Sequence, residues 1–314
     1  MWNNIGLIKA KNLDSEHFTS DVGIKIRRII NPVVRKVVSK TIDKEIVVLD
    51  YPVLDKNEAF IFAGGHLFPG EIESNISVID RNAYVLIGTT DQVDHNPSMY
   101  GAWINGMIYV NKLNQDSRTE SQKKIKRILN SGSSVLMFPE GVLNNSENLL
   151  IMPLYPGIYY MSLETGKRIV PIVSHTENGM DKIYVKAGKP ICFEGLSKLE
   201  ALKLLRDELA TLRFDIISEL EPLERKKLTG DIHQQHMEYR RDVYREVKWH
   251  SDVWDEEIMV YHGHDSISPE EVRATFDSVK ITPDNANIFG PTLVKRLEDK
   301  KYDFKNYMKE NWNK

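Results

Sequence analysis

A single cysteine, no long apolar run and no excess of either charge are the first features of this 314-residue sequence. Cys192 alone excludes an internal disulfide and a cysteine-rich metal site, and it fits a reducing compartment. The net charge of -3 gives no basic excess for binding nucleic acid. No apolar run approaches the roughly 18 residues of a membrane-spanning helix, and the first residues lack the apolar core of a secretory signal. We therefore expect a cytoplasmic globular protein with no nucleic-acid partner.

Several familiar catalytic signatures are also missing. The sequence has neither the G-x-S-x-G elbow of a serine hydrolase nor the G-x-G-x-x-G loop of a dinucleotide site. In GHLFPGEI, Glu71 and Ile72 stand where a phosphate loop requires Lys and Ser or Thr. The histidine pairs in HQQH and YHGHD lack further ligands at metal-site spacing. We expect neither a metal nor a bound cofactor.

Short β-branched runs alternate with amphipathic segments between about residues 45 and 200. This pattern predicts an α/β fold with a mostly parallel central sheet covered by helices on both faces. We expect an N-terminal amphipathic helical segment (1–44), a catalytic domain (45–200) and a mainly helical C-terminal extension (201–314). The predicted strands are 45–50, 58–64, 83–88, 107–111, 133–140 and 168–174, and the predicted helices in the domain are 72–80, 97–105, 117–130 and 156–165.

The stretch 22–42 has aliphatic residues at helical spacing, with lysines and arginines on the other side. Two interpretations are open. In the commoner one the aliphatic stripe packs on the protein's own core, and in the other the helix lies at a membrane surface. Asn31 and Pro32 resemble a cap and a first helical residue, so the stretch also fits two short helices.

A histidine and a carboxylate follow the predicted strand 58–64. Gly64 and Gly65 end this strand and place His66 in the loop beyond it, where α/β proteins carry catalytic side chains. An imidazole can act as a general base near neutral pH, and a carboxylate on its second nitrogen fixes its tautomer. Glu71 is the candidate carboxylate. A lone histidine after a strand is more often structural, so the rest of the chain must support the site.

Four blocks supply that support, because in this order they resemble the glycerolipid acyltransferase family over about residues 58–192. In GHLFPGE, His66 matches the histidine of the family's first motif, N-H-x-x-x-x-D, and Glu71 replaces its aspartate. The other blocks are GMIYVNK, FPEG and the VP of RIVPIVS, and KAGKPICF is similar to the family's closing strand.

The resemblance implies an O-acyltransferase that moves a fatty acyl group from an acyl thioester to a hydroxyl of an acceptor like lysophosphatidic acid. The donor would be acyl-coenzyme A or an acyl-carrier protein. His66 would be the general base and Glu71 the group that orients it. The residues that would shape or bind the acceptor site are Gly106, Lys112, Pro139, Glu140 and Gly141.

Two departures from the family pattern leave the acceptor open. The family usually has arginine where Lys112 stands, and a basic residue soon after FPEG, where this chain has Val142 and Leu143. Lysine binds phosphate only as a point charge, without the guanidinium fork. The alternatives are a non-phosphorylated sugar or glycolipid acceptor, or a catalytically inactive lipid-binding relative.

Two further features bear on partners. On residue type alone, Glu140 is also explained as a carboxylate that ends a strand. A basic helical cluster either meets the phosphates of coenzyme A, an acidic carrier protein or anionic lipid, or forms a solvated face. We expect a cytoplasmic location with peripheral contact at the inner membrane face. The cluster consists of Lys123, Lys124, Lys126 and Arg127.

Overall fold

The structure is a computed structural model that describes residues 14–68, 70–88, 106–111, 114–144, 149–176 and 180–220, with positions 234 and 238. The chain divides into two compact units, Met1–His264 and Asp265–Lys314, and all described residues belong to the first. The predicted helix 97–105, the residue Lys112 and most of the chain after residue 220 lie outside the described part.

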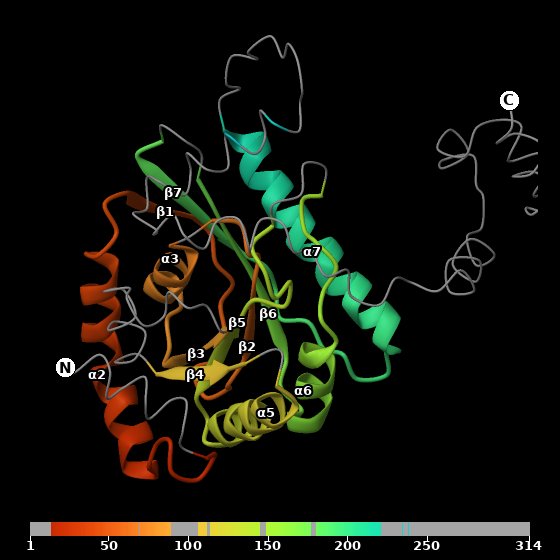
Figure 1. Cartoon of the computed structure of the whole chain (residues 1–314). Coiled ribbons are helices and arrows are strands. Elements are labelled where there is room, and N and C mark those ends of the chain that lie inside the picture. The colour runs from red at the N-terminus through yellow and green to blue at the C-terminus, as the bar shows by residue number, and fades with distance from the viewer. Residues whose placement is uncertain are drawn as a thin grey trace, which may run out of the picture. The chain divides into compact units, whose positions relative to one another are not determined.

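Seven strands form one sheet in the described part of the chain, and the α/β prediction is confirmed (Figure 1). The strand order is β1-β7-β6-β2-β5-β3-β4, and all neighbouring pairs are parallel except the antiparallel pair β6 and β7. The strands are β1 (Glu45–Asp50), β2 (Ile61–Gly64), β3 (Ala83–Gly88), β4 (Met107–Val110), β5 (Ser134–Met137), β6 (Ile169–His175) and β7 (Lys182–Ala187).

All six predicted strands are present, and the seventh, β7, was not predicted as a separate strand. In the sequence KIYVKA, Lys182, Tyr184 and Lys186 alternate with small or aliphatic residues, which is the pattern of a strand with one buried face. The segment KAGKPICF, which is similar to the family's closing strand, includes only the last two residues of β7.

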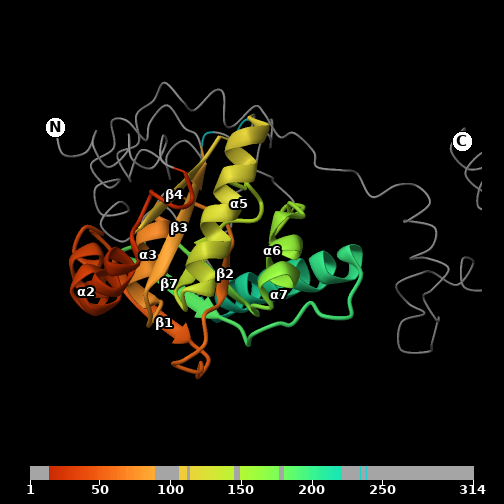
Figure 2. The ribbon, with the colours of Figure 1, turned by 90° about the horizontal axis from the view of Figure 1, so that it is seen from below.

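Helices cover both faces of the sheet (Figures 1 and 2). Helices α2 (Asp21–Ser39) and α3 (Glu71–Val78) contact each other on one face. On the opposite face lie α5 (Gln115–Asn130), α6 (Gly157–Thr165) and α7 (Lys198–Glu219). Helix α7 contacts β6 and β7, so the first helix of the predicted C-terminal extension packs directly on the sheet.

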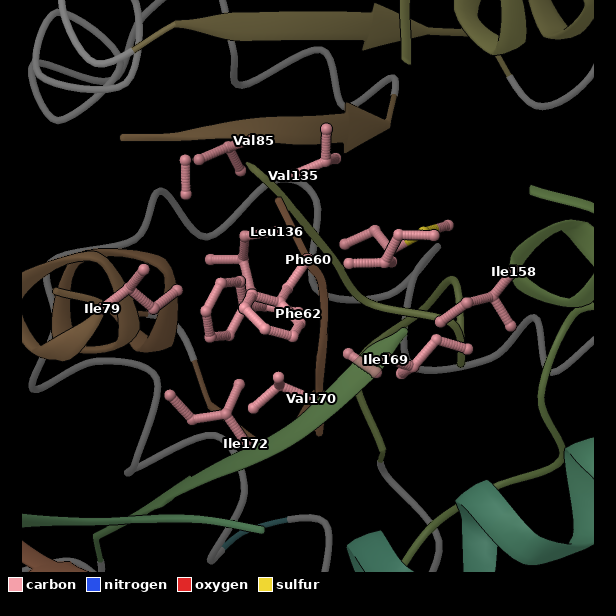
Figure 3. Close-up of a cluster of buried hydrophobic side chains, with 14 of the residues drawn as sticks. Phe60, Phe62, Ile79, Val85, Val135, Leu136, Ile158, Ile169, Val170 and Ile172 are labelled. Carbon is pink, nitrogen blue, oxygen red and sulfur yellow. The ribbon is translucent and has the colours of Figure 1, made fainter. Parts of the chain in front are cut away.

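The core lies on both sides of the central strands (Figure 3). Phe60, Ile61, Phe62 and Ala63 are all completely buried, which explains the continuous apolar run of this segment. In Figure 3, Ile79 beside α3 and Ile158 of α6 lie on opposite sides of the strands. Because β2 and β5 are parallel neighbours, the loops that follow them leave the same edge of the sheet.

Helix α2 is one continuous helix that includes Pro32, so the prediction of two short helices is wrong. Two of its three arginines point inward: Arg35 donates a hydrogen bond to the carbonyl of Ile79 (2.6 Å), and the guanidinium of Arg27 lies 5.5 Å from the centre of the Tyr84 ring. The larger part of its aliphatic stripe is exposed instead of packing on the core. The exposed aliphatic residues are Val22, Ile26, Ile29, Ile30, Val33 and Val37.

Within the described part of the chain, no helix combines the length and hydrophobicity that crossing a bilayer requires.

Candidate active site

The loop after β2 and the start of α3 bring His66 and Glu71 together, as the sequence predicts. One carboxylate oxygen of Glu71 is hydrogen-bonded to Nδ1 of His66. The side chain of Glu71 is 1% exposed, whereas that of His66 is 24% exposed. An ionised carboxylate can only accept, so Nδ1 carries the proton of the neutral imidazole and the lone pair is on Nε2. None of the described residues forms a hydrogen bond to Nε2, which is therefore the nitrogen available for chemistry.

A glutamate fits this position because it serves the whole loop as well as the imidazole. Its second oxygen, Oε2, accepts hydrogen bonds from the backbone N–H groups of Leu67 (2.7 Å) and Phe68 (3.3 Å). Glu71 is also the first residue of α3, where the helix dipole favours a negative charge. The carboxylate thus folds back from the start of the helix and holds three successive residues of the loop.

Glu140 holds the same loop from the turn that follows the neighbouring strand β5. Its Oε1 accepts a hydrogen bond from the backbone N–H of His66 (2.6 Å), and its Oε2 accepts one from the N–H of Met152 (2.8 Å). The side chain is 1% exposed, and burial raises the pKa of the carboxyl to about 7 against the opposing effect of the two N–H donors. Both oxygens are engaged by the protein's own backbone, and the contact of Glu140 with an acceptor stays a prediction.

The FPEG segment is a tight turn that directs Glu140 inward. Phe138 places its ring 4.8 Å from the imidazole of His66, centre to centre. The carbonyl of Pro139 accepts a hydrogen bond from the N–H of Tyr155 (2.7 Å). Gly141 has φ +72°, and a Cβ there would lie 2.3 Å from the Tyr155 ring, so both its conformation and its lack of a side chain are required. Pro139 and Gly141 therefore shape the turn through their backbones.

The predicted residues of the second block are only partly described. Gly106, just before β4, has φ +99°, and a Cβ there would lie 2.5 Å from the Tyr84 ring. It takes no part in the hydrogen bonds around His66. Lys112 lies outside the described residues. After FPEG, Val142 is half-buried and Leu143 is 3% exposed, so the positions where the family has a basic residue are apolar and turned inward.

The basic cluster on α5 is used mainly within the molecule. Lys124 is buried, with its ammonium group 5.6 Å from the centre of the Phe18 ring. Arg127 donates hydrogen bonds to two backbone carbonyls of the segment that precedes α2 (2.7 and 2.6 Å). Lys123 and Lys126 form ion pairs with acidic neighbours. Lys124 and Arg127 are thus structural contacts, which neither of the two interpretations anticipated, whereas Lys123 is exposed as on a solvated face.

Sequence reasoning missed a buried polar group beneath α3. Ser174 of β6 donates a hydrogen bond to Oδ1 of Asn75 (2.7 Å), and Ser74 donates one to Ser174 (3.0 Å). All three side chains are completely buried. They join the helix that begins with Glu71 to the central sheet. Ser174 lies about 100 residues from its partners, so no local pattern in the sequence reveals the group.

Comparisons with known proteins bear on the family and on the fold. A model of the acyltransferase family matches residues 76–175, a range that includes Glu140 and begins after His66 and Glu71. The fold is similar to that of the 1-acyl-sn-glycerophosphate (LPA) acyltransferase PlsC from Thermotoga maritima, with a TM-score of 0.52 and 13% sequence identity. The similarity covers 70% of this chain and 90% of that one. A search of curated proteins gives no match to the sequence.

Proposed function

The chain belongs to the acyltransferase family, and we propose that it transfers a fatty acyl group from an acyl thioester to a hydroxyl of a lysophospholipid-like acceptor. The observation that carries the proposal is the imidazole of His66, whose Nδ1 is held by the buried carboxylate of Glu71 and whose Nε2 is left for a substrate. The donor is acyl-coenzyme A or an acyl-carrier protein. The leading acceptor resembles lysophosphatidic acid, because the structural relative from Thermotoga maritima is named for that substrate.

In the proposed reaction, Nε2 of His66 removes the proton of the acceptor hydroxyl while the oxygen attacks the thioester carbonyl. Glu71 stabilises the imidazolium that forms and keeps the ring in place. The tetrahedral intermediate then collapses: the C–S bond breaks, the new ester remains, and the proton on Nε2 passes to the departing sulfur. The acyl group moves directly from donor to acceptor, without a covalent bond to the protein.

A second candidate acceptor is a neutral sugar or glycolipid. The specific observation in its favour is the apolar character of the segment after FPEG, where Leu143 is buried and Val142 is half-buried. The phosphate of a phosphorylated acceptor would have to be bound mainly by residues outside this segment, and Lys112 is the candidate cation.

One experiment separates these possibilities. The purified protein is incubated with a radiolabelled acyl thioester and a total lipid extract, and both thiol release and the labelled product are measured. A labelled phosphatidic acid supports the leading acceptor, and a labelled neutral product supports the second. If no lysolipid or glycolipid accelerates thiol release, the acyltransferase proposal fails and an inactive lipid-binding relative is the better account.

We also propose that the outward face of α2 rests on an anionic membrane surface, which would bring the protein to a lipid substrate. Ile29 is 77% exposed and Val33 is 65% exposed, in a stripe that runs the length of the helix. Lys25 and Lys36 are exposed and stand three or four residues from members of this stripe, so cations border the aliphatic side chains. Exposed aliphatic residues flanked by lysine are suited to the interface of an anionic bilayer.

The membrane proposal is tested with substitutions that leave the buried side of α2 unchanged. We expect the double variant Ile29→Ser/Val33→Ser to sediment with phosphatidylglycerol-containing vesicles about tenfold less than the wild type, because it removes apolar area that enters the interface. Val53→Ser, at a fully exposed position outside α2, is the control. Equal sedimentation of all three proteins contradicts the proposal. A change in oligomeric state without a change in vesicle binding instead identifies the stripe as a contact between copies.

A further inference from the structure

The backbone of His66 is held on both sides by the loop that follows β5. Its N–H donates to Glu140, and its carbonyl accepts a hydrogen bond from the backbone N–H of Asn144 (2.6 Å). Nothing in the side-chain chemistry of His66 requires the second bond. Its effect is to fix the peptide planes before and after the imidazole, and with them the direction in which the ring leaves the chain.

The side chain of Asn144 connects this bond to a second stretch of backbone. It is buried, and its amide nitrogen donates to the carbonyls of Leu149 (3.0 Å) and Leu150 (3.2 Å). Two residues further on, the N–H of Met152 donates to Glu140. The segment from Leu149 to Met152 is therefore tied both to Asn144 and to Glu140, the two residues that bond the backbone of His66.

Helix α7 fastens this segment from the other side. The guanidinium of Arg213 donates a hydrogen bond to the carbonyl of Leu150, the same oxygen that Asn144 contacts. Leu209, Leu212 and Ile216 are buried around Arg213 and anchor the helix on the sheet. The guanidinium is thus held by a rigid element and reaches a carbonyl near the base.

We propose that Asn144 and Arg213 are positioning residues for His66, acting through the segment from Leu149 to Met152. The inference rests on the proposed function, in which His66 is the base, and it gives α7 a part in the active site. Without these donors, the carbonyls of Leu149 and Leu150 lose buried partners and the segment moves, and Glu140 and Asn144 move with it. A displacement of about 1 Å at a catalytic group can lower turnover about a hundredfold.

Two variants, Arg213→Met and Asn144→Ala, test the proposal with a kinetic and a structural readout. Arg206→Met is the matched control, because Arg206 lies seven residues earlier on α7 and has no hydrogen bond or ion pair to a described residue. We expect both variants to lower kcat for acyl transfer about tenfold to a hundredfold, with KM for the thioester changed less than twofold. In the His66→Ala background neither substitution should lower the residual rate further, whereas a role unrelated to His66 would lower it again.

Hydrogen exchange decides the structural part of the proposal without any assay of activity. The backbone amides of His66 and Met152 should exchange at least about tenfold faster in both variants than in the wild type, and Arg206→Met should leave them unchanged. Unchanged exchange at His66 overturns the proposal, as does a loss of activity that persists in the His66→Ala background. If the wild type itself transfers no acyl group, the proposed function fails and the exchange data still judge the positioning role. Should Arg213→Met fail to fold, Arg213→Lys is expected to show smaller changes in the same direction.

Discussion

Replacing Glu140 with glutamine should make the protein's stability less sensitive to pH. In the folded protein the pKa of this carboxyl is raised from its ordinary 4.5 to about 7, chiefly by burial. Between these two values the unfolded chain ionises Glu140 while the folded chain keeps the proton. The unfolded state then binds fewer protons, so the free energy of unfolding falls as pH rises through this range and levels off above about pH 7.

The size of the effect follows from the two pKa values. At about 1.4 kcal/mol for each pH unit, the whole range from 4.5 to about 7 corresponds to about 3 kcal/mol, and the part between pH 5.5 and 8 to about 2 kcal/mol. The glutamine variant does not ionise. It also offers only one carbonyl oxygen to the N–H groups of His66 and Met152, a cost of about 1–3 kcal/mol that does not depend on the ionisation of residue 140.

Urea unfolding of the wild type and Glu140→Gln at pH 5.5, 6.5, 7.5 and 8 is the assay. The free energy of unfolding of the variant relative to the wild type should rise by about 2 kcal/mol over this range, with most of the change below pH 7. Glu194→Gln, at an exposed position, controls for the loss of one negative charge. A difference that stays constant with pH, or that moves in favour of the wild type as pH rises, refutes the account of Glu140.

Substitutions at three other positions test the site and its surroundings. Glu71→Gln should lower turnover about 10⁴-fold, because an amide NH₂ facing Nδ1 favours the wrong imidazole tautomer, whereas Glu71→Asp should lower turnover about tenfold. Equal rates for Glu71→Gln and the wild type would show that Glu71 does not orient the imidazole. Gly141→Ala should lower the free energy of unfolding, measured by chemical denaturation, by more than about 2 kcal/mol. The control Gly166→Ala should lower it by about 1 kcal/mol, because Gly166 has φ +63° but open space around it. Ser174→Ala should lower the free energy of unfolding by about 1–3 kcal/mol, because it leaves the buried amide oxygen of Asn75 without this donor. Ser77→Ala, in helix α3, should cost less.

The fold was predictable because each strand can be recognised from its own local sequence. In a parallel sheet both faces of a strand are buried, so FIFA around β2 and IVPIV in β6 read as continuous apolar runs. The orientation of α2 was not predictable from the same kind of pattern. Helical spacing shows which residues share a side of the helix, but it does not show that Arg35 and Arg27 pack inward. Their partners are the carbonyl of Ile79 and the ring of Tyr84, which distant elements supply.

In the candidate site, too, contacts between residues close in the sequence were predictable and contacts between distant residues were not. His66 and Glu71 are five residues apart, and their contact follows from a loop that leads directly into a helix. The bond from His66 to Glu140 spans 74 residues and depends on β2 and β5 being neighbours in the sheet. Arg213 joins the same region from a helix 63 residues beyond its partner. Strand order and packing determine contacts of this kind, so they cannot be predicted from the spacing of residues in the sequence.

The central claim, that His66 is the base of an acyl transfer, is tested most directly by comparing the wild type with His66→Ala. Thiol release from an acyl thioester is measured in the presence of the acceptor identified from the lipid extract, with circular dichroism to verify that the variant is folded. We predict that the substitution lowers turnover about 10²-fold to 10⁴-fold, the usual contribution of a general base. A folded His66→Ala protein that releases thiol at the wild-type rate would contradict the account.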